Sequence, residues 1–339
     1  MAGRKTVYNY ITDPESIANI NEQNKKLMSD FSDYLISTDR NYSTVKAYES
    51  DLLIFFCWNL KNNGNKYFAD LKKRDIAAFQ KYAMTEWQWS SNRLARVKST
   101  LSSLSNYIEN MLDDELPDYR PIIRKIESPV KQAVREKTIV TDKEVDMVLR
   151  ELVKNKKYQQ ACAFALAAFS GARKSELLLF KCSYFTDDNI MDGASLYRTP
   201  EKIRTKGRGK AGKLLTKYTL LDFKKYYDLW MKERERLGLT ENDSLFVNTE
   251  TGETLRASAL DSYTNVISKI LGKPFYFHAL RHQLCTRLMK IGIPTDTIQE
   301  YFGWANIAMI STYNDNDASD SFGKFFTENG IIGVGSNTL

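Results

Sequence analysis

The sequence His-Ala-Leu-Arg-His at residues 278–282 is followed by Phe-Gly-Trp at residues 302–304 and by Tyr313. Both histidines of the chain lie in the first of these segments. Because residues three apart on a helix project from the same face, Arg281 and His278 can hold one anion, for which a phosphate is the natural candidate. Tyr313 reaches that anion if the intervening chain folds back on this helix. A tyrosine beside a clamped phosphodiester can attack phosphorus.

The composition is that of a globular protein. Its 339 residues exceed the usual size of one domain, so we expect two domains. The start of the chain is polar, and no apolar run is long enough for a membrane span. The four cysteines are scattered without a CxxC pair, which is typical of buried thiols in a reducing compartment. We therefore expect a cytoplasmic protein with no membrane partner. The sequence shows no cluster of carboxylates of the kind that binds catalytic metals, so we expect no metal site.

The charge distribution indicates a polyanionic partner. The net charge of +7 is modest, but residues 202–217 carry many lysines and arginines, no acid, and interleaved glycines. On charge alone a solvated loop explains this run equally well.

The first part of the chain predicts a helical bundle. Residues 1–20 show weak periodicity, which fits an arm or a short leading helix. Apolar residues then recur at helical spacing as far as residue 116. From 117 to 137 the periodicity lapses among prolines and mixed charges, as in an interdomain linker. The expected helices span residues 24–37, 43–58 with Ser43 as N-cap, 73–85 and 91–108.

Residues 138–339 form the second predicted domain. Thr141 is expected to cap a helix, and the strongly apolar segment 159–170 predicts a central helix that Gly171 ends. Between residues 180 and 221, short β-prone patches surround the glycine-lysine run, which indicates a small antiparallel sheet with a flexible hairpin. The predicted fold is mainly α with a small antiparallel β-sheet.

Arg173 lies where the central helix stops and a new helix starts, rather than on a solvated helix face. Glu176, three residues later, could orient its guanidinium. Taken alone, the pair fits a first-turn ion pair without chemistry better than a catalytic pair. The carboxyl-terminal segments favour the catalytic interpretation.

Taken in order, these segments resemble the tyrosine recombinases, the phage-integrase-like family that includes the Xer and Cre enzymes. The resemblance rests on Ala-Arg-Lys-Ser-Glu-Leu at 172–177, a lysine in a predicted hairpin turn at 205–207, the His-x-x-Arg box, the Gly-Trp pair and Tyr313. Each motif is weak alone, but their order and spacing are specific. The resemblance implies a helical core-binding (SAM-like) DNA-binding domain at 21–116 and a catalytic domain with a C-terminal tail at 138–339.

The resemblance implies that Arg173 and Arg281 clamp the two non-bridging oxygens of the scissile phosphate. A planar, always charged guanidinium suits that task. Lys206 is the implied general acid for the departing 5′ oxygen, with Lys210 and Lys213 as less favoured candidates.

Tyr313 is the implied nucleophile, which forms a 3′-phosphotyrosyl bond, and His278 is the implied base. Trp304 stands where many relatives have histidine; its indole can donate to a phosphate oxygen but cannot transfer a proton. Glu176 and His282 are expected to support the site, with His282 pointing away from the arginine that precedes it.

Two further expectations concern the carboxyl end. Tyr301 is the near competitor as nucleophile, but it falls on the wrong side of the Gly-Trp pair for the family pattern. In the tail, Phe322, Phe325 and Phe326 fit a short helix that buries one apolar face in a neighbouring subunit or packs back in cis.

The resemblance implies a site-specific DNA recombinase that needs no cofactor, because a phosphotyrosine keeps the energy of the broken diester. Duplex DNA is the expected partner. Four protomers would exchange strands through a Holliday junction and interact through their tails, with a monomer or dimer in the absence of DNA. Two alternatives are a type IB topoisomerase-like enzyme and a catalytically silent DNA-binding protein of the same fold. The residues expected to contact DNA are Thr44, Lys46, Arg93, Arg96, Lys98, Arg204, Arg208 and Lys210.

Overall fold

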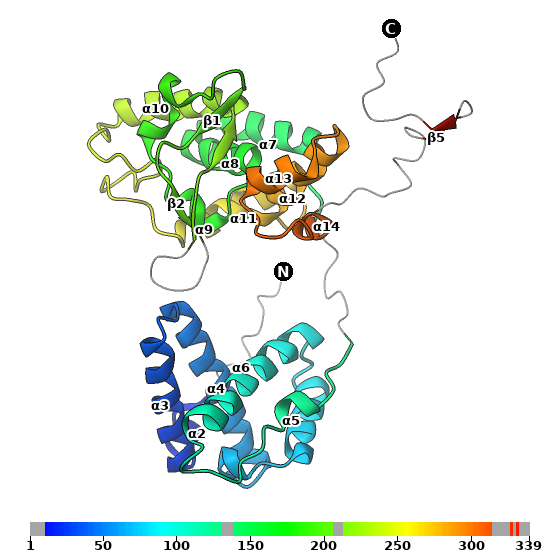
Figure 1. Ribbon diagram of the computed structural model, residues 1–339. Coiled ribbons are helices and arrows are strands. Elements are labelled where there is room, and N and C mark those ends of the chain that lie inside the picture. The colour runs from blue at the N-terminus through cyan, green and yellow to red at the C-terminus, as the bar shows by residue number, and fades with distance from the viewer. Residues whose placement is uncertain (1–10, 131–137, 206–212, 314–325, 328–329, 332–339) are drawn as a thin grey trace. The chain divides into compact units, whose positions relative to one another are not determined.

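The computed structural model describes residues 11–130, 138–205, 213–313, 326–327 and 330–331 (Figure 1). These residues divide into two compact units, one on each side of residues 131–137. The fold is mainly helical with small antiparallel strand pairs, as the sequence predicts.

The first unit is a helical bundle around one apolar core. A short leading helix packs on it, which is one of the two possibilities predicted for this segment. Ile11 and Ile20, on either side of that helix, are buried in the same core, so residues 11–20 are part of the bundle. The helices are α2 (Pro14–Ala18), α3 (Glu22–Ser37), α4 (Tyr42–Asn62), α5 (Lys73–Thr85) and α6 (Ser91–Met111), with a 3₁₀ turn η1 (Phe68–Asp70).

Helix α4 begins before the predicted cap. Asn41 accepts the backbone N–H of Ser43 at 3.0 Å and is the N-cap, whereas Ser43 was predicted. The Ser43 hydroxyl itself donates to the Asn41 side chain at 2.8 Å, so the earlier residue takes the capping position.

The chain beyond residue 116 continues to pack on the first unit, where a linker was predicted. Ile123, in the 3₁₀ turn η2 (Ile123–Lys125), is 2% exposed. The Lys98 ammonium is buried and donates to the carbonyl oxygens of Ile126 at 2.9 Å and Glu127 at 3.2 Å, and to the Ser128 hydroxyl at 2.8 Å. Lys98 therefore fixes this segment within the unit.

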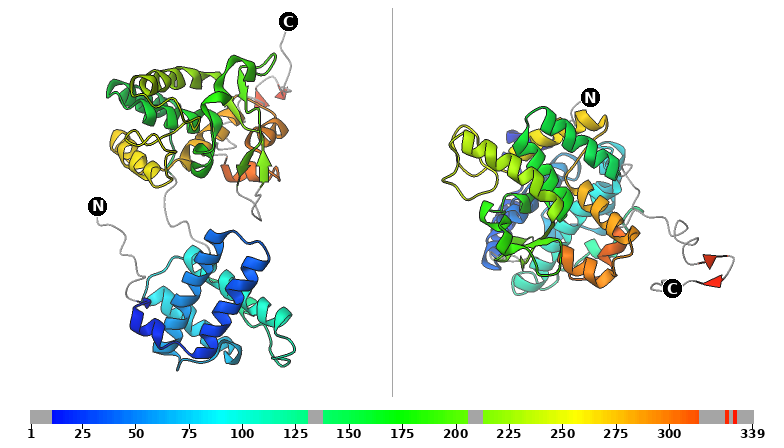
Figure 2. Two further views of the ribbon diagram at one scale, coloured as in Figure 1. Left: turned by 90° about the vertical axis from the view of Figure 1, so that its left-hand side faces the viewer. Right: turned by 90° about the horizontal axis from the view of Figure 1, so that it is seen from above.

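The second unit, which Figure 2 shows from two further sides, is built around α8 (Tyr158–Ser170). The residues of α8 from Ala161 to Ser170 are buried. Helix α8 packs against α7 (Asp142–Lys154), α10 (Lys224–Arg236) and α12 (His278–Lys290). As predicted, Thr141 caps α7 and Gly171 ends α8, with a left-handed φ of 59°. The remaining helices are α9 (Lys174–Leu177), α11 (Ala259–Leu271), α13 (Thr295–Phe302) and α14 (Met309–Tyr313), with 3₁₀ turns η3 (Cys182–Phe185), η4 (Asp187–Asn189) and η5 (Leu221–Phe223).

The strands form separate antiparallel pairs. Strand β1 (Leu196–Arg198) pairs with β4 (Tyr218–Leu220), and β2 (Ile203–Thr205) pairs with β3 (Lys213–Leu215). A third pair joins β5 (Phe326–Thr327) and β6 (Gly330–Ile331). Phe326 therefore lies in a strand and not in the predicted tail helix, while Phe322 and Phe325 lie outside the described residues.

Candidate active site

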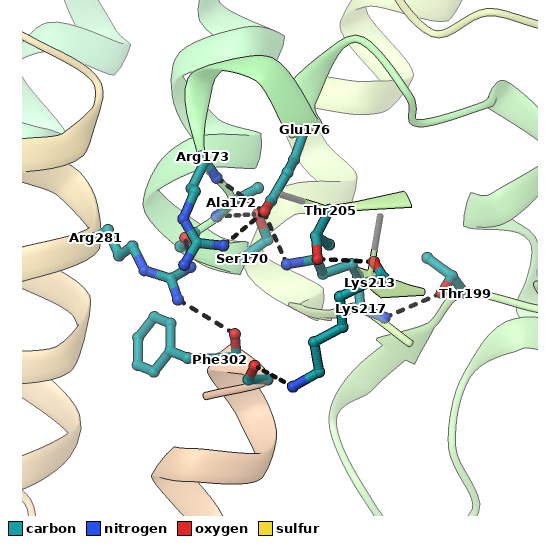
Figure 3. Close-up of polar contacts among 12 residues, drawn as sticks. Ser170, Ala172, Arg173, Glu176, Thr199, Thr205, Lys213, Lys217, Arg281 and Phe302 are labelled. Atoms are coloured by element: carbon teal, nitrogen blue, oxygen red, sulfur yellow. Dashed lines mark hydrogen bonds and ion pairs between the residues drawn. The ribbon is translucent and has the colours of Figure 1, made fainter. Parts of the chain in front are cut away.

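Helix α12 carries the His-x-x-Arg box, and its Arg281 is buried in the second unit, at 1% exposure. The guanidinium donates from Nη1 to the carbonyl oxygen of Gly171 at 2.6 Å. It also donates from Nη2 to the carbonyl oxygen of Phe302 at 3.2 Å (Figure 3). Its side chain thus joins the ends of α8 and α13 to α12. Burial, and then the nearby charge of Arg173, lower the pKa of Arg281 to about 10. Burial and the neighbouring positive charge make the charged form of Arg281 less favourable. A bound anion would offset both effects, so the site favours anion binding.

A glycine makes the contact between these segments possible. Gly171 has a positive φ, and a Cβ built there would lie 2.3 Å from Cε1 of Phe302. A larger residue would push the end of α13 away and move the Phe302 carbonyl that holds Arg281.

Arg173 is the N-cap of α9, and Glu176 orients it. The Glu176 carboxylate accepts the Arg173 backbone N–H at 3.0 Å and Nη1 at 2.7 Å. The Arg173 side chain is 28% exposed, whereas that of Glu176 is 1% exposed. Arg173 can therefore reach a bound anion while its carboxylate partner stays inside the protein.

A second cation pairs with the same carboxylate, and the sequence did not single it out. Lys217 donates from Nζ to Oε2 of Glu176 at 2.7 Å, and its side chain is 3% exposed. Lys217 closes the basic run that we interpreted as a hairpin. Strand β4 begins at the next residue, Tyr218, but no local pattern in the sequence distinguishes Lys217 from the exposed lysines of that run.

Tyr313 lies among the residues of the predicted site, at the end of α14. Its ring centroid is 5.2 Å from that of His278 and 4.6 Å from that of His282, and the Arg281 Cζ is 5.4 Å from it. The side chain is buried. The structure therefore brings Tyr313 together with the His-x-x-Arg box in one chain. His282 was expected to play a supporting part, and it packs directly on Tyr313.

Trp304 forms the other wall around Tyr313. The two rings stack with centroids 4.9 Å apart and an interplanar angle of 27°. Within the part of the chain that the structure describes, Nε1 of Trp304 and Nε of Arg281 are buried and have no hydrogen-bond acceptor. Two N–H donors are thus available beside the tyrosine, as a phosphate site requires.

Tyr301, the alternative nucleophile, is committed elsewhere. Its hydroxyl donates to the carbonyl oxygen of Phe169 at 2.5 Å, and burial raises its pKa. A phenol that is buried, hydrogen-bonded and harder to ionise is a poor nucleophile.

The predicted hairpin lysine is not described. Lys206, Arg208 and Lys210 lie outside the described residues. Strands β2 and β3 on either side belong to the second unit, where Lys213 donates to the Gly303 carbonyl at 3.3 Å. The β3 residue Leu215 packs so closely on Gly303 that a Cβ there would lie 2.4 Å from it. The strands that flank the hairpin therefore adjoin the Gly-Trp pair.

Four of the residues expected to contact DNA make side-chain ion pairs or hydrogen bonds inside the first unit. Arg93 and Arg96 pair with the buried carboxylate of Asp51 at 3.1 and 3.2 Å. Lys98 is buried and donates to the segment after η2, so a structural role accounts for this lysine and no DNA contact is needed to explain it. Lys46 is exposed and pairs with Glu49 at 2.8 Å. Arg204 is exposed and Thr44 is half-buried.

The described residues meet the requirements of neither a clustered metal site nor a membrane-spanning helix. In the described ranges, no three His, Cys, Asp or Glu side chains are grouped as a metal site would need. No helix in those ranges is both long and apolar enough to cross a bilayer.

Comparison with known proteins places this geometry in a family. The model of the phage integrase family matches residues 139–320. The chain is 28% identical to the SPbeta prophage-derived recombinase-like protein YomM of Bacillus subtilis (strain 168), over 80% of each chain. It is also 28% identical to the tyrosine recombinase XerD of Listeria monocytogenes serotype 4b (strain F2365), over 85% of this chain and 93% of that one.

The fold agrees with solved structures. The XerH site-specific recombinase, in a post-cleavage complex with a palindromic difH substrate, matches with a TM-score of 0.65 and 19% identity. The match covers 94% of this chain and 89% of that one. The family match, the fold and the clustering of Arg173, Arg281 and Tyr313 agree. The chain therefore belongs to the phage integrase family and is a site-specific recombinase of the tyrosine type.

Proposed function

We propose that this protein cuts and rejoins duplex DNA at a specific site through a covalent 3′-phosphotyrosyl bond to Tyr313. The observation that carries the proposal is the enclosure of the Tyr313 ring by His278, Trp304 and the Arg281 guanidinium. A tyrosine in ordinary packing has no need of this combination of cation, imidazole and unpaired N–H donor.

In the proposed cleavage step, Arg173 and Arg281 bind the two non-bridging oxygens of the scissile phosphate. Tyr313 Oη attacks phosphorus and the bond to the 5′ oxygen breaks, so one phosphodiester replaces another. His278 accepts the phenolic proton, and Lys206 donates a proton to the departing oxygen. The arginine charges offset the negative charge that builds up in the transition state, which is the largest catalytic effect expected in such a site.

Rejoining reverses these steps. A 5′ hydroxyl from a partner strand attacks the phosphotyrosine and releases Tyr313. The exchange needs no nucleotide, metal or other cofactor, because the number and type of ester bonds are unchanged. In the proposed complete reaction, four protomers exchange two pairs of strands through a Holliday junction, and their C-terminal tails link neighbouring subunits. The protein is proposed to be a monomer or dimer before it binds DNA.

The proposed biological task is integration and excision, or resolution, of DNA in the cytoplasm of a prokaryotic cell. The relatives support this range, since one is described as prophage-derived and another is a XerD recombinase. The first unit is the proposed core-binding domain and the second the catalytic domain. The proposed DNA contacts are Thr44, Lys46, Arg93, Arg96, Arg204, Arg208 and Lys210; Lys98 is now assigned a structural part.

The test begins with DNA that cross-links to the protein, which identifies a binding site by sequencing. A nicked suicide duplex of that site should trap a covalent adduct with the wild-type protein and none with Tyr313→Phe. Paired sites on one plasmid should then give recombinant product. Relaxation of supercoils without any recombinant product would indicate a topoisomerase-like enzyme instead. A protein that binds the site but forms no adduct would be a silent DNA-binding relative.

A further inference from the structure

The buried ion pair of Lys217 and Glu176 lies behind the phosphate-binding arginines. Both side chains are almost fully buried, at 3% and 1% exposure. Removing two charges from water is unfavourable, and burial of this kind is not needed for stability, because well-packed apolar residues would do as well. The pair therefore calls for an explanation beyond packing.

Glu176 is shared between two cations. Lys217 Nζ lies 2.7 Å from Oε2, and Arg173 Nη1 lies 2.7 Å from Oε1 (Figure 3). The carboxylate fixes the direction of the Arg173 guanidinium. By itself, however, it would also offset most of that guanidinium's positive charge, because opposite charges at such distances interact strongly away from bulk water.

We propose that Lys217 is a positioning residue for DNA cleavage, which neutralises Glu176 so that Glu176 can orient Arg173 without cancelling the charge that binds the scissile phosphate. With Lys217 present, the three side chains keep one net positive charge for the substrate. Without it, Arg173 and Glu176 form a neutral pair. This inference rests on the proposed function, since it concerns the same phosphate site.

The backbone delivers Lys217 to this position. Its N–H donates to the Thr199 hydroxyl at 3.1 Å, and its carbonyl accepts the Thr199 N–H at 3.0 Å. These bonds continue the pairing of β1 with β4, in which Arg198 is opposite Tyr218. The ammonium is thus supported by a paired strand and not by a free loop.

The pKa of Lys217 reflects the same electrostatic neighbourhood. Burial lowers it, Glu176 opposes that effect, and the charges of Arg281 and Arg173 lower it further. Lys217 therefore lies within the positive field of both phosphate-binding arginines. Because its ammonium is buried against Glu176, we assign it no proton transfer to the leaving oxygen, which stays with Lys206.

The test compares Lys217→Met, which keeps the shape and removes the charge, with Lys217→Arg, which keeps the charge and changes the shape. Lys232→Met, at an exposed position on α10, is the control for loss of one positive charge. The measurement is the single-turnover rate constant for adduct formation with enzyme in saturating excess over a suicide duplex. This rate constant does not depend on the fraction of protein that is folded.

We expect Lys217→Met to slow adduct formation about ten-fold or more, because one charge is lost close to the phosphate. Lys217→Arg should lose less than Lys217→Met, and Lys232→Met should keep the wild-type rate. If Lys217 mattered only for packing, the order of the Met and Arg variants would be reversed.

A double variant separates charge from shape. Glu176→Gln combined with Lys217→Met keeps an oxygen that can accept from Arg173 but removes the charge that opposes it, so it should recover part of the lost rate. A wild-type rate in Lys217→Met, or a further loss in the double variant, would overturn the inference. Failure of the wild-type protein to form any adduct would instead refute the proposed function.

Discussion

The ring of Tyr313 stacks on the indole of Trp304, with centroids 4.9 Å apart, and Trp304 stacks in turn on Phe302 at 4.6 Å. Trp304 thus has two separable parts in the proposed site. Its ring holds the tyrosine in place, and its Nε1–H is available for a phosphate oxygen.

Replacement of Trp304 should separate these two parts. Trp304→Phe keeps a stacking ring and loses the donor, so we expect adduct formation to slow about ten-fold with little change in melting temperature. Trp304→Ala also removes the wall against Tyr313 and leaves a cavity, so it should destabilise the fold by about 3–5 kcal/mol. Thermal melting and single-turnover rates measure the two effects. Equal rates in the Phe variant and the wild type would remove the indole N–H from the mechanism.

The two arginines should differ in what they contribute to the fold. Arg173→Ala leaves Glu176 paired with Lys217, so the protein should stay folded and bind DNA while cleavage falls about a thousand-fold or more. Arg281→Ala leaves the buried carbonyls of Gly171 and Phe302 without their donor and should destabilise the protein by about 1–3 kcal/mol for each. Gel-shift, adduct and melting measurements on both variants check this. A stable Arg281→Ala protein would contradict the structural part assigned to that side chain.

Gly171 should tolerate no side chain. Gly171→Ala combines an unfavourable positive φ with a clash against Phe302. Gly193 has a similar φ of 71° but open space around its Cα, so Gly193→Ala reports the backbone cost alone, about 1 kcal/mol. We expect Gly171→Ala to lose a further 1–3 kcal/mol or so by chemical denaturation. Similar losses in the two variants would mean that the contact with Phe302 adjusts easily.

Lys98 should act on stability and not on DNA affinity. Lys98→Ala removes the donor to the carbonyls of Ile126 and Glu127, which predicts a loss of about 1–3 kcal/mol in the unfolding free energy of the protein. Lys81→Ala, at an exposed position on α5, is the matched control and should change stability by less than about 0.5 kcal/mol. A Lys98→Ala protein of normal stability with weakened DNA binding would restore the original assignment of Lys98 as a DNA contact.

Local rules predicted much of this molecule. The spacing of His278 and Arg281, the cap at Thr141 and the stop at Gly171 all depend on residues within one or two helical turns, and the structure has them as expected. The meeting of Tyr313 with this box needed the family pattern, because its position depends on how α13 and α14 fold back on α12.

Contacts between segments that are distant in the sequence could not be predicted from such local patterns. Lys217 meets Glu176 only because β4 pairs with β1, and no local pattern separates a buried lysine from an exposed one in a basic run. Lys98 was assigned to DNA for its charge, although its partners lie in a segment whose apolar residues are too few to show periodicity. Long basic side chains are thus the residues whose burial the sequence predicted least well.

The central claim is that the oxygen of Tyr313 forms the bond to DNA. The direct measurement is to trap the protein on a suicide duplex of its own site, digest the adduct with protease and nuclease, and locate the nucleotide-bearing peptide by mass spectrometry. The account predicts a single modified residue, Tyr313, and no adduct in Tyr313→Phe. Modification at Tyr301 or at any other residue, or an undiminished adduct in Tyr313→Phe, would contradict it.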